Sequence, residues 1–146
     1  MNAVSQAITP DLTVKIANLA VLFRAEFPDV QIDLSPWLTD AKAQDQLNPY
    51  SIDLSFFLPE HGDILACQCV LMQVHFSDDL LQPTCRLSTI QVDGYNCTQR
   101  QWQFSTEDWM FSGVSIPDND HQKQFKHLIN RILELFQYPN QVNIYG

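Results

Sequence analysis

Cysteine and histidine side chains that could share a metal ion or a reaction lie in the middle of this 146-residue sequence. Cys67 and Cys69 are two residues apart, so both thiols would lie on the same face of a β-strand. Structural zinc sites take four ligands and usually separate paired cysteines by two to four residues around a turn. A Cys-x-Cys pair within a strand lacks that geometry, whereas small buried side chains are a common role for cysteine. The sequence therefore predicts no bound metal.

A second possible pairing joins His75 with Cys85, which would be cross-strand neighbours if the hairpin between them closed near Leu80. A Cys-His nucleophile also needs a group that orients the imidazole and donors that stabilise an oxyanion. The sequence places neither a glycine-shaped turn nor the start of a helix beside these two residues. His75 and Cys85 are therefore candidate catalytic residues, but a structural role is the favoured interpretation of both.

His121 is the third candidate catalytic residue. It lies four residues before Phe125 and extends the apolar stripe of a C-terminal helix, where the helix dipole disfavours a charged imidazole. A calcium loop beginning at Asp118 is excluded, because Lys123 and Ile129 stand where its glycine and final glutamate belong. No phosphate-binding glycine loop or hydrolase motif is present. We therefore expect neither catalysis nor a cofactor.

The charge balance excludes two classes of partner. The sequence has 17 acidic and eight basic residues, which gives a formal net charge of −9. A protein with this charge repels both nucleic acids and anionic membranes. No apolar stretch approaches the roughly 20 residues of a membrane span, and the first residues show no secretory signal. These features predict a cytoplasmic protein whose four cysteines are reduced and form no disulfide.

The elements that must position these side chains follow from hydrophobic spacing and from turn residues. Thr9 and Pro10 can begin a helix whose apolar residues recur at helical spacing until Pro28. A short helix is expected at 37–47 and a long one at 119–137, and Asp93-Gly94 indicates a hairpin turn. Strands are expected at 30–34, 52–58, 64–76, 85–92, 97–104 and 109–114.

The predicted fold is α+β, a four- to five-stranded antiparallel meander with an N-terminal and a C-terminal helix packed on it. Its element order is α-β-(short α)-β-β-β-β-(β)-α, within one domain over 1–146 whose ends, 1–8 and 140–146, are tails. A turn joining Leu58 to Ile64 would place Ile52 opposite Val70. Six residues are expected in the core: Ile16, Phe23, Leu54, Phe56, Val70 and Ile129.

Aromatic residues supply the clearest candidate for an interaction site. Trp109 and Phe111 lie in the apolar segment 109–116, which is flanked by acidic residues and so has the composition of an interface centre with a polar rim. An equally supported interpretation is that this segment completes the core beneath the last helix.

Two functions remain open on the sequence. The first is a non-enzymatic interaction or regulatory domain that binds a protein partner or self-associates. The second is a small-molecule-binding domain or small enzyme, with His75, Cys85 and His121 in a pocket between the sheet and the terminal helix.

Overall fold

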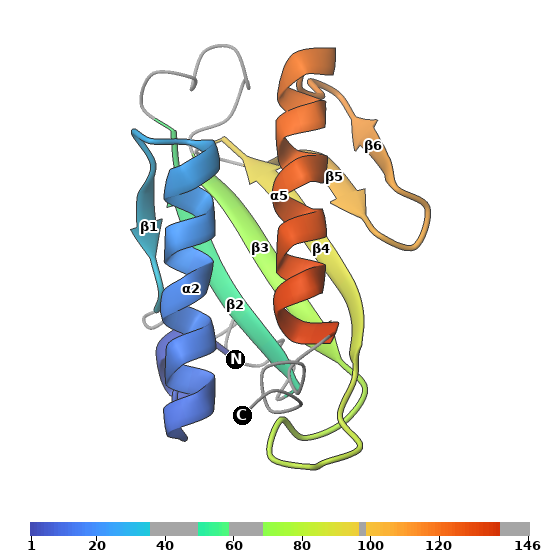
Figure 1. The fold of residues 1–146 in the computed structure, drawn as a ribbon. Helices are drawn as coiled ribbons and strands as arrows, with labels where there is room; N and C mark the ends of the chain where they lie inside the picture. Colours follow the sequence, from blue (N-terminus) through green and yellow to red (C-terminus); the bar gives the residue numbers. More distant parts are fainter. Residues whose placement is uncertain (36–49, 59–68, 97–98, 138–146) are drawn as a thin grey trace.

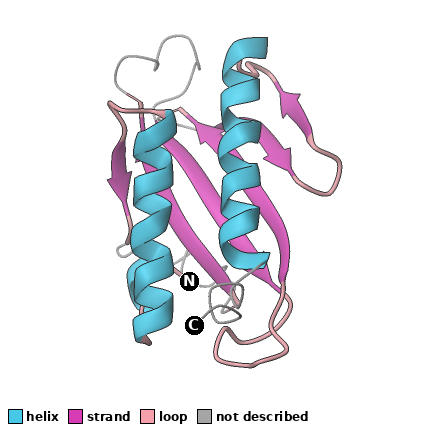
Figure 2. Cartoon of the chain, viewed as in Figure 1, coloured by secondary structure: helices cyan, strands magenta, loops and turns pink. Residues whose placement is uncertain are grey.

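The computed structural model describes residues 1–35, 50–58, 69–96 and 99–137 and confirms the α+β class. Two long helices, α2 (Pro10–Glu26) and α5 (Asn119–Gln137), lie side by side on one face of an antiparallel sheet (Figures 1 and 2). The sheet has six strands in sequence order, one more than the upper limit of the expected four to five. The number of strands is higher than expected because the short strands at both edges of the sheet, the first and the last in the chain, pair with their neighbours. The strands are β1 (Gln31–Asp33), β2 (Ser51–Phe57), β3 (Cys69–Phe76), β4 (Leu87–Tyr95), β5 (Arg100–Ser105) and β6 (Met110–Gly113).

Both long helices begin where their capping residues indicate. The Thr9 hydroxyl accepts a hydrogen bond from the Leu12 backbone N–H at 3.1 Å, and Pro10 occupies the first turn of α2. At α5, the Asp118 carboxylate accepts from the backbone N–H of His121 at 2.9 Å. Each cap satisfies a backbone donor that has no partner within its helix.

The hydrophobic core fills the space between the sheet and the two long helices. All six residues expected there are buried, none more than 4% exposed. Phe23 of α2 and Phe125 of α5 meet over Phe56 of β2, with ring centroids 4.6 Å and 6.2 Å from that ring. The core therefore joins both helices to the central strands.

The register between β2 and β3 differs from the expected one by four residues. Ile52 lies opposite Val74, and Val70 lies opposite Phe56. Side chains alternate with a period of two, so a shift by an even number leaves every residue on its own face. Hydrophobic patterning therefore fixes the faces but not the register. The connection that sets it, 59–68, lies outside the described residues.

Asp93 and Gly94 do not form the expected hairpin turn. Both lie within β4, which continues to Tyr95, and Gly94 is opposite Trp102 of β5. A Cβ atom on Gly94 would lie 2.3 Å from the Trp102 indole, which is almost completely buried. Glycine is required here because an aromatic side chain packs across the backbone, as it often does for glycines inside strands.

Residues 1–8 are not the expected tail. They contain α1 (Ala3–Gln6), and Asn2 forms an isolated parallel bridge with Asp53 at the edge of β2. Gln6 donates from its amide to the Ser51 carbonyl at 2.9 Å. The segment therefore covers part of the strand edge that the three-residue β1 leaves open.

Several sequence predictions lie outside the described residues: the short helix at 37–47, the first part of the strand at 64–76, Cys67, Cys97 and the tail at 140–146. Among the helices that are described, none is long and apolar enough to cross a membrane.

Candidate functional site

The structure does not place Cys85 opposite His75. His75 pairs with Ser51 on one side and Thr89 on the other, while Cys85 lies before β4 and directs its thiol to the Asp78 carbonyl at 3.5 Å. Burial lowers the pKa of His75 and raises the pKa of the Cys85 thiol. Both shifts favour the neutral forms. A thiol kept protonated and away from a base is poorly suited to nucleophilic catalysis.

His121 helps to fasten the start of α5. Its ring Nδ1 lies 2.7 Å from Asp118 Oδ1, the same carboxylate oxygen that accepts the His121 backbone N–H. These two hydrogen bonds, the backbone one first, lower the pKa of Asp118. The His121 side chain is 11% exposed. His121 therefore acts in helix capping, whereas His75 lies in β3 and Cys85 in the connection before β4.

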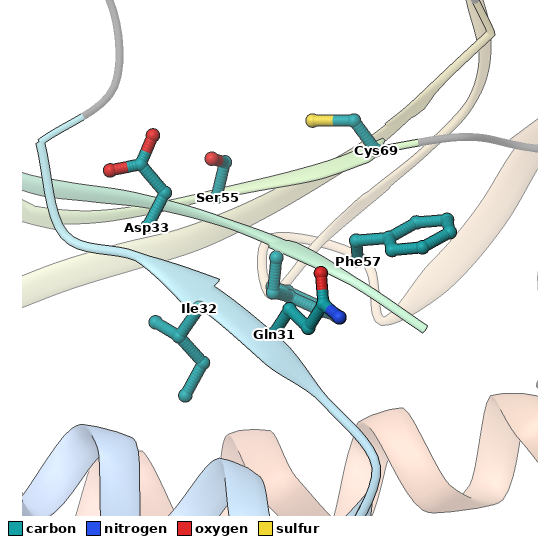
Figure 3. A pocket seen from close by; sticks show the side chains of 7 residues that line it. Gln31, Ile32, Asp33, Ser55, Phe57 and Cys69 are labelled. Carbon is teal, nitrogen blue, oxygen red and sulfur yellow. The ribbon is translucent and has the colours of Figure 1, made fainter. Parts of the chain in front are cut away.

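A shallow hollow of about 280 Å³ lies at the β1 edge of the sheet (Figure 3). Asp33, Ser55 and Cys69 point to the side of the sheet away from the helices, and the Ser55 side chain hydrogen-bonds to the Cys69 thiol. Burial raises the pKa of Cys69 more than this hydrogen bond lowers it, so the thiol form is favoured. Sequence reasoning weighed Cys69 only as a metal ligand. It missed Asp33 and Ser55, because their opposition depends on the pairing of β1 with β2.

In the described part of the chain, no group of three or more His, Cys, Asp or Glu side chains is placed to hold a metal ion. The space between α5 and the sheet is filled by core side chains, among them Phe125, Ile129 and Ile132. Sequence reasoning placed its alternative small-molecule site in this space.

Trp109 and Phe111 contribute to the core more than to the surface. Phe111 is 9% exposed and packs against Phe104, Trp102 and Phe125, with ring centroids 4.7 to 6.1 Å apart. Trp109 is half-buried and meets Phe104 edge to face at 5.8 Å. Both rings therefore pack as expected if this segment completes the core beneath the last helix.

Three other apolar side chains of the same segment are exposed: Met110 by 64%, Val114 by 84% and Ile116 by 45%. We call Met110, Val114 and Ile116 the β6 surface. Sequence reasoning chose the aromatic residues instead, because aromatic side chains are enriched in interface centres. The alternation of side chains along β6 could have identified Met110, once Phe111 was assigned to the core.

The β6 surface lies beside a strand edge that no other described strand covers. β6 is last in the sheet order, and Val114 donates its backbone N–H to the Gln101 carbonyl at 2.8 Å. Since alternate residues of an antiparallel strand bond to the same neighbour, the backbone N–H and C=O of Phe111 point away from β5. Exposed Glu107 and Asp108 stand at the start of the strand. This edge can accept a further strand between apolar side chains and an acidic rim.

A family model described as a domain of unknown function matches residues 4–138, from α1 to the end of α5. No curated protein and no solved structure matches the chain.

Proposed function

The chain belongs to this family of domains of unknown function, and we propose that it is a non-catalytic, cytoplasmic protein-interaction domain that binds its partner at the β6 surface. The observation that carries the proposal is the combination of three exposed apolar side chains with a strand edge that is uncovered among the described strands. Apolar side chains gathered in one place on a surface often mark protein contacts. Free thiols at Cys69 and Cys85 are compatible with a reducing compartment.

The partner that fits this edge is an extended segment of another protein. Its backbone would pair with Phe111, and its apolar side chains would cover Met110 and Val114. Basic residues on either side of that segment would complement Glu107 and Asp108, and the net charge of −9 would speed their association. The raised thiol pKa values of Cys69 and Cys85 add support for a role without catalysis.

A display library of random peptides tests this proposal. Peptides selected on the whole chain should alternate apolar with basic residues and should protect the Phe111 amide from hydrogen exchange. Met110→Gln combined with Val114→Gln should weaken their binding at least about tenfold, the equivalent of 1.4 kcal/mol. The matched control is Val14→Gln with Val21→Gln, two equally apolar and exposed residues of α2. Equal binding to wild type and to the β6 double variant would disprove the proposal.

A further inference from the structure

The side of α2 that faces away from the sheet is mostly apolar. The core contacts of α2 are made by Leu12, Ile16, Leu19 and Phe23. The opposite side carries the residues that we call the outer face of α2: Val14, Ala17, Asn18, Val21 and Ala25, all exposed. Val14 and Val21 are each 59% exposed. Successive residues of a helix are about 100° apart, so these five positions centre directly opposite the core contacts.

The neighbouring helix shows what an ordinary outer side looks like. The exposed residues of α5 whose side chains are described are all polar: Asn119, Asp120, Lys123, His127, Asn130, Arg131 and Glu134. Both helices cover the same face of the sheet (Figure 1). A helix that is apolar on two opposite sides is usually buried on both. The outer face of α2 therefore lacks the polar covering that α5 has.

Charges at the two ends of this face indicate what covers it. Asp11 lies near the start of α2 and Arg24 near its end, and both are exposed. Within the described part of the chain, Arg24 forms no ion pair, while Asp11 pairs only with Lys15 at 3.2 Å. A helix of the same sequence running in the opposite direction would present a complementary pattern.

We propose that the chain self-associates through the outer faces of two α2 helices packed antiparallel about a two-fold axis. An axis between Ala17 and Asn18 places Val14 opposite the partner's Val21 and brings Asp11 level with the partner's Arg24. The two alanines allow the helices to approach closely, and antiparallel helix dipoles attract one another. A parallel pair would instead place like charges together at both ends.

This inference does not depend on the proposed function. α2 lies toward the β1 side of the sheet, whereas β6 forms the other edge (Figure 1). A dimer through α2 leaves both β6 surfaces free. If the β6 surface does bind a partner, the dimer presents two copies of it, and a partner with two suitable segments binds more tightly by avidity.

Sedimentation velocity of the whole chain between about 1 and 500 μM tests the inference, because one pair of helices makes a small interface and a weak dimer. Val14→Gln with Val21→Gln should raise the dimer dissociation constant at least about tenfold. Glutamine is a good helix former, so the melting temperature should be preserved. Met110→Gln with Val114→Gln is the matched control and should leave the dimer unchanged.

The inference is overturned if the wild type is monomeric throughout this range or if the α2 double variant still dimerises. It is also overturned if the β6 double variant alone abolishes the dimer. That result would support the β6 surface as an interaction site and would identify its partner as a second copy of the chain. Conversely, if no selected peptide binds at the β6 surface, the proposed function is wrong, but the inference of an α2 dimer is unaffected.

A charge exchange distinguishes a second copy from any other occupant. Arg24→Asp should weaken the dimer by bringing two carboxylates level across the interface, and adding Asp11→Arg should restore it. Both substitutions oppose the dipole of α2, so circular dichroism must show that the helix content is retained. Failure of the double variant to dimerise better than Arg24→Asp would overturn the antiparallel arrangement.

Discussion

Two carboxylates on the face of the sheet opposite the helices are nearly inaccessible to water. Asp53 is fully buried, and its carboxylate accepts from the Ser51 hydroxyl at 2.7 Å and pairs with the Met1 ammonium group at 3.1 Å. Asp93 is 3% exposed, accepts from the Gln91 amide at 3.2 Å and lies 3.8 Å from the Arg100 guanidinium. Burial raises the pKa of Asp93 more than these two neighbours lower it. The charged form of Asp93 therefore costs folding free energy.

Asp93→Asn should increase the free energy of unfolding at about pH 7. Because the pKa of Asp93 is higher in the folded state than its ordinary value of 3.8, the folded state holds this proton more tightly. The wild type recovers the lost stability as the pH falls through the folded pKa, so the gain from asparagine should vanish below pH 3.8. Urea unfolding across this pH range measures the effect. Glu107→Gln, at an exposed carboxylate, is the control, and a gain independent of pH would contradict this explanation.

Gly94→Ala should destabilise the chain by about 1–3 kcal/mol, the usual cost of forcing an additional methyl group into a packed site. The new Cβ would lie 2.3 Å from the buried Trp102 indole, so that ring must move. Trp102→Phe introduces a smaller ring, and Gly94→Ala should cost less in that background. Thermal unfolding of the two single variants and the double variant measures this coupling. Additive losses would show that the indole is not the obstacle.

At the scale of elements, the long helices could be predicted because their signals are local. Thr9, Pro10 and Asp118 act within one turn of the backbone they cap. The pairing of strands is not local. Ile52 could lie opposite Val70 or Val74 without changing the face of any side chain, and Asp93-Gly94 has the composition of a turn although Trp102 packs across it.

In the candidate interaction site, too, the local composition could be predicted from the sequence, whereas the strand pairing could not. Trp109, Phe111 and the exposed residues beside them belong to one apolar segment, and only the pairing of Phe104 with Phe111 decides which side chains enter the core. Sequence reasoning therefore located the segment but chose its buried residues. The sequence also contains Val14 and Val21 of the outer face of α2. Apolar residues in a helix are normally assigned to the core, so this face is recognised only when the helix is checked for a second apolar side.

Trp109→Ala should lower the free energy of unfolding by about 2 kcal/mol, less than a fully buried tryptophan would cost. The backbone of Trp109 has φ of +58°, in the left-handed region. Alanine keeps the Cβ and therefore the strain, so the loss reports the packing of the ring on Phe104. Met110→Ala, at an exposed neighbour, should change stability by less than about 0.5 kcal/mol. Chemical denaturation measures both, and equal losses would contradict a core role for Trp109.

At the scale of the whole molecule, two apolar surfaces lie on a strongly acidic chain. Each copy carries a net charge of −9, so copies repel one another at long range while the ends of α2 attract at short range. These interactions respond differently to salt. The Debye length is about 30 Å at 0.01 M and about 8 Å at 0.15 M, so moderate salt removes repulsion between molecular centres on the order of 30 Å apart. Ion pairs within about 4 Å are much less affected.

The α2 dimer should therefore be tightest at an intermediate salt concentration. Treated as point charges, two copies repel by on the order of a few kcal/mol at 0.01 M and by a few tenths at 0.15 M, so the dissociation constant should fall over this range. At about 1 M the Debye length shortens to about 3 Å, the pairing of Asp11 with the partner's Arg24 is screened as well, and this electrostatic contribution is lost. Sedimentation velocity at the three concentrations measures the trend. The variant Asp11→Asn with Arg24→Gln retains the net charge of −9. In this variant the dimer should still tighten between about 0.01 and 0.15 M salt, but it should no longer weaken toward about 1 M. A dimer that weakens steadily from the lowest salt would show instead that ion pairs outweigh net charge even at long range.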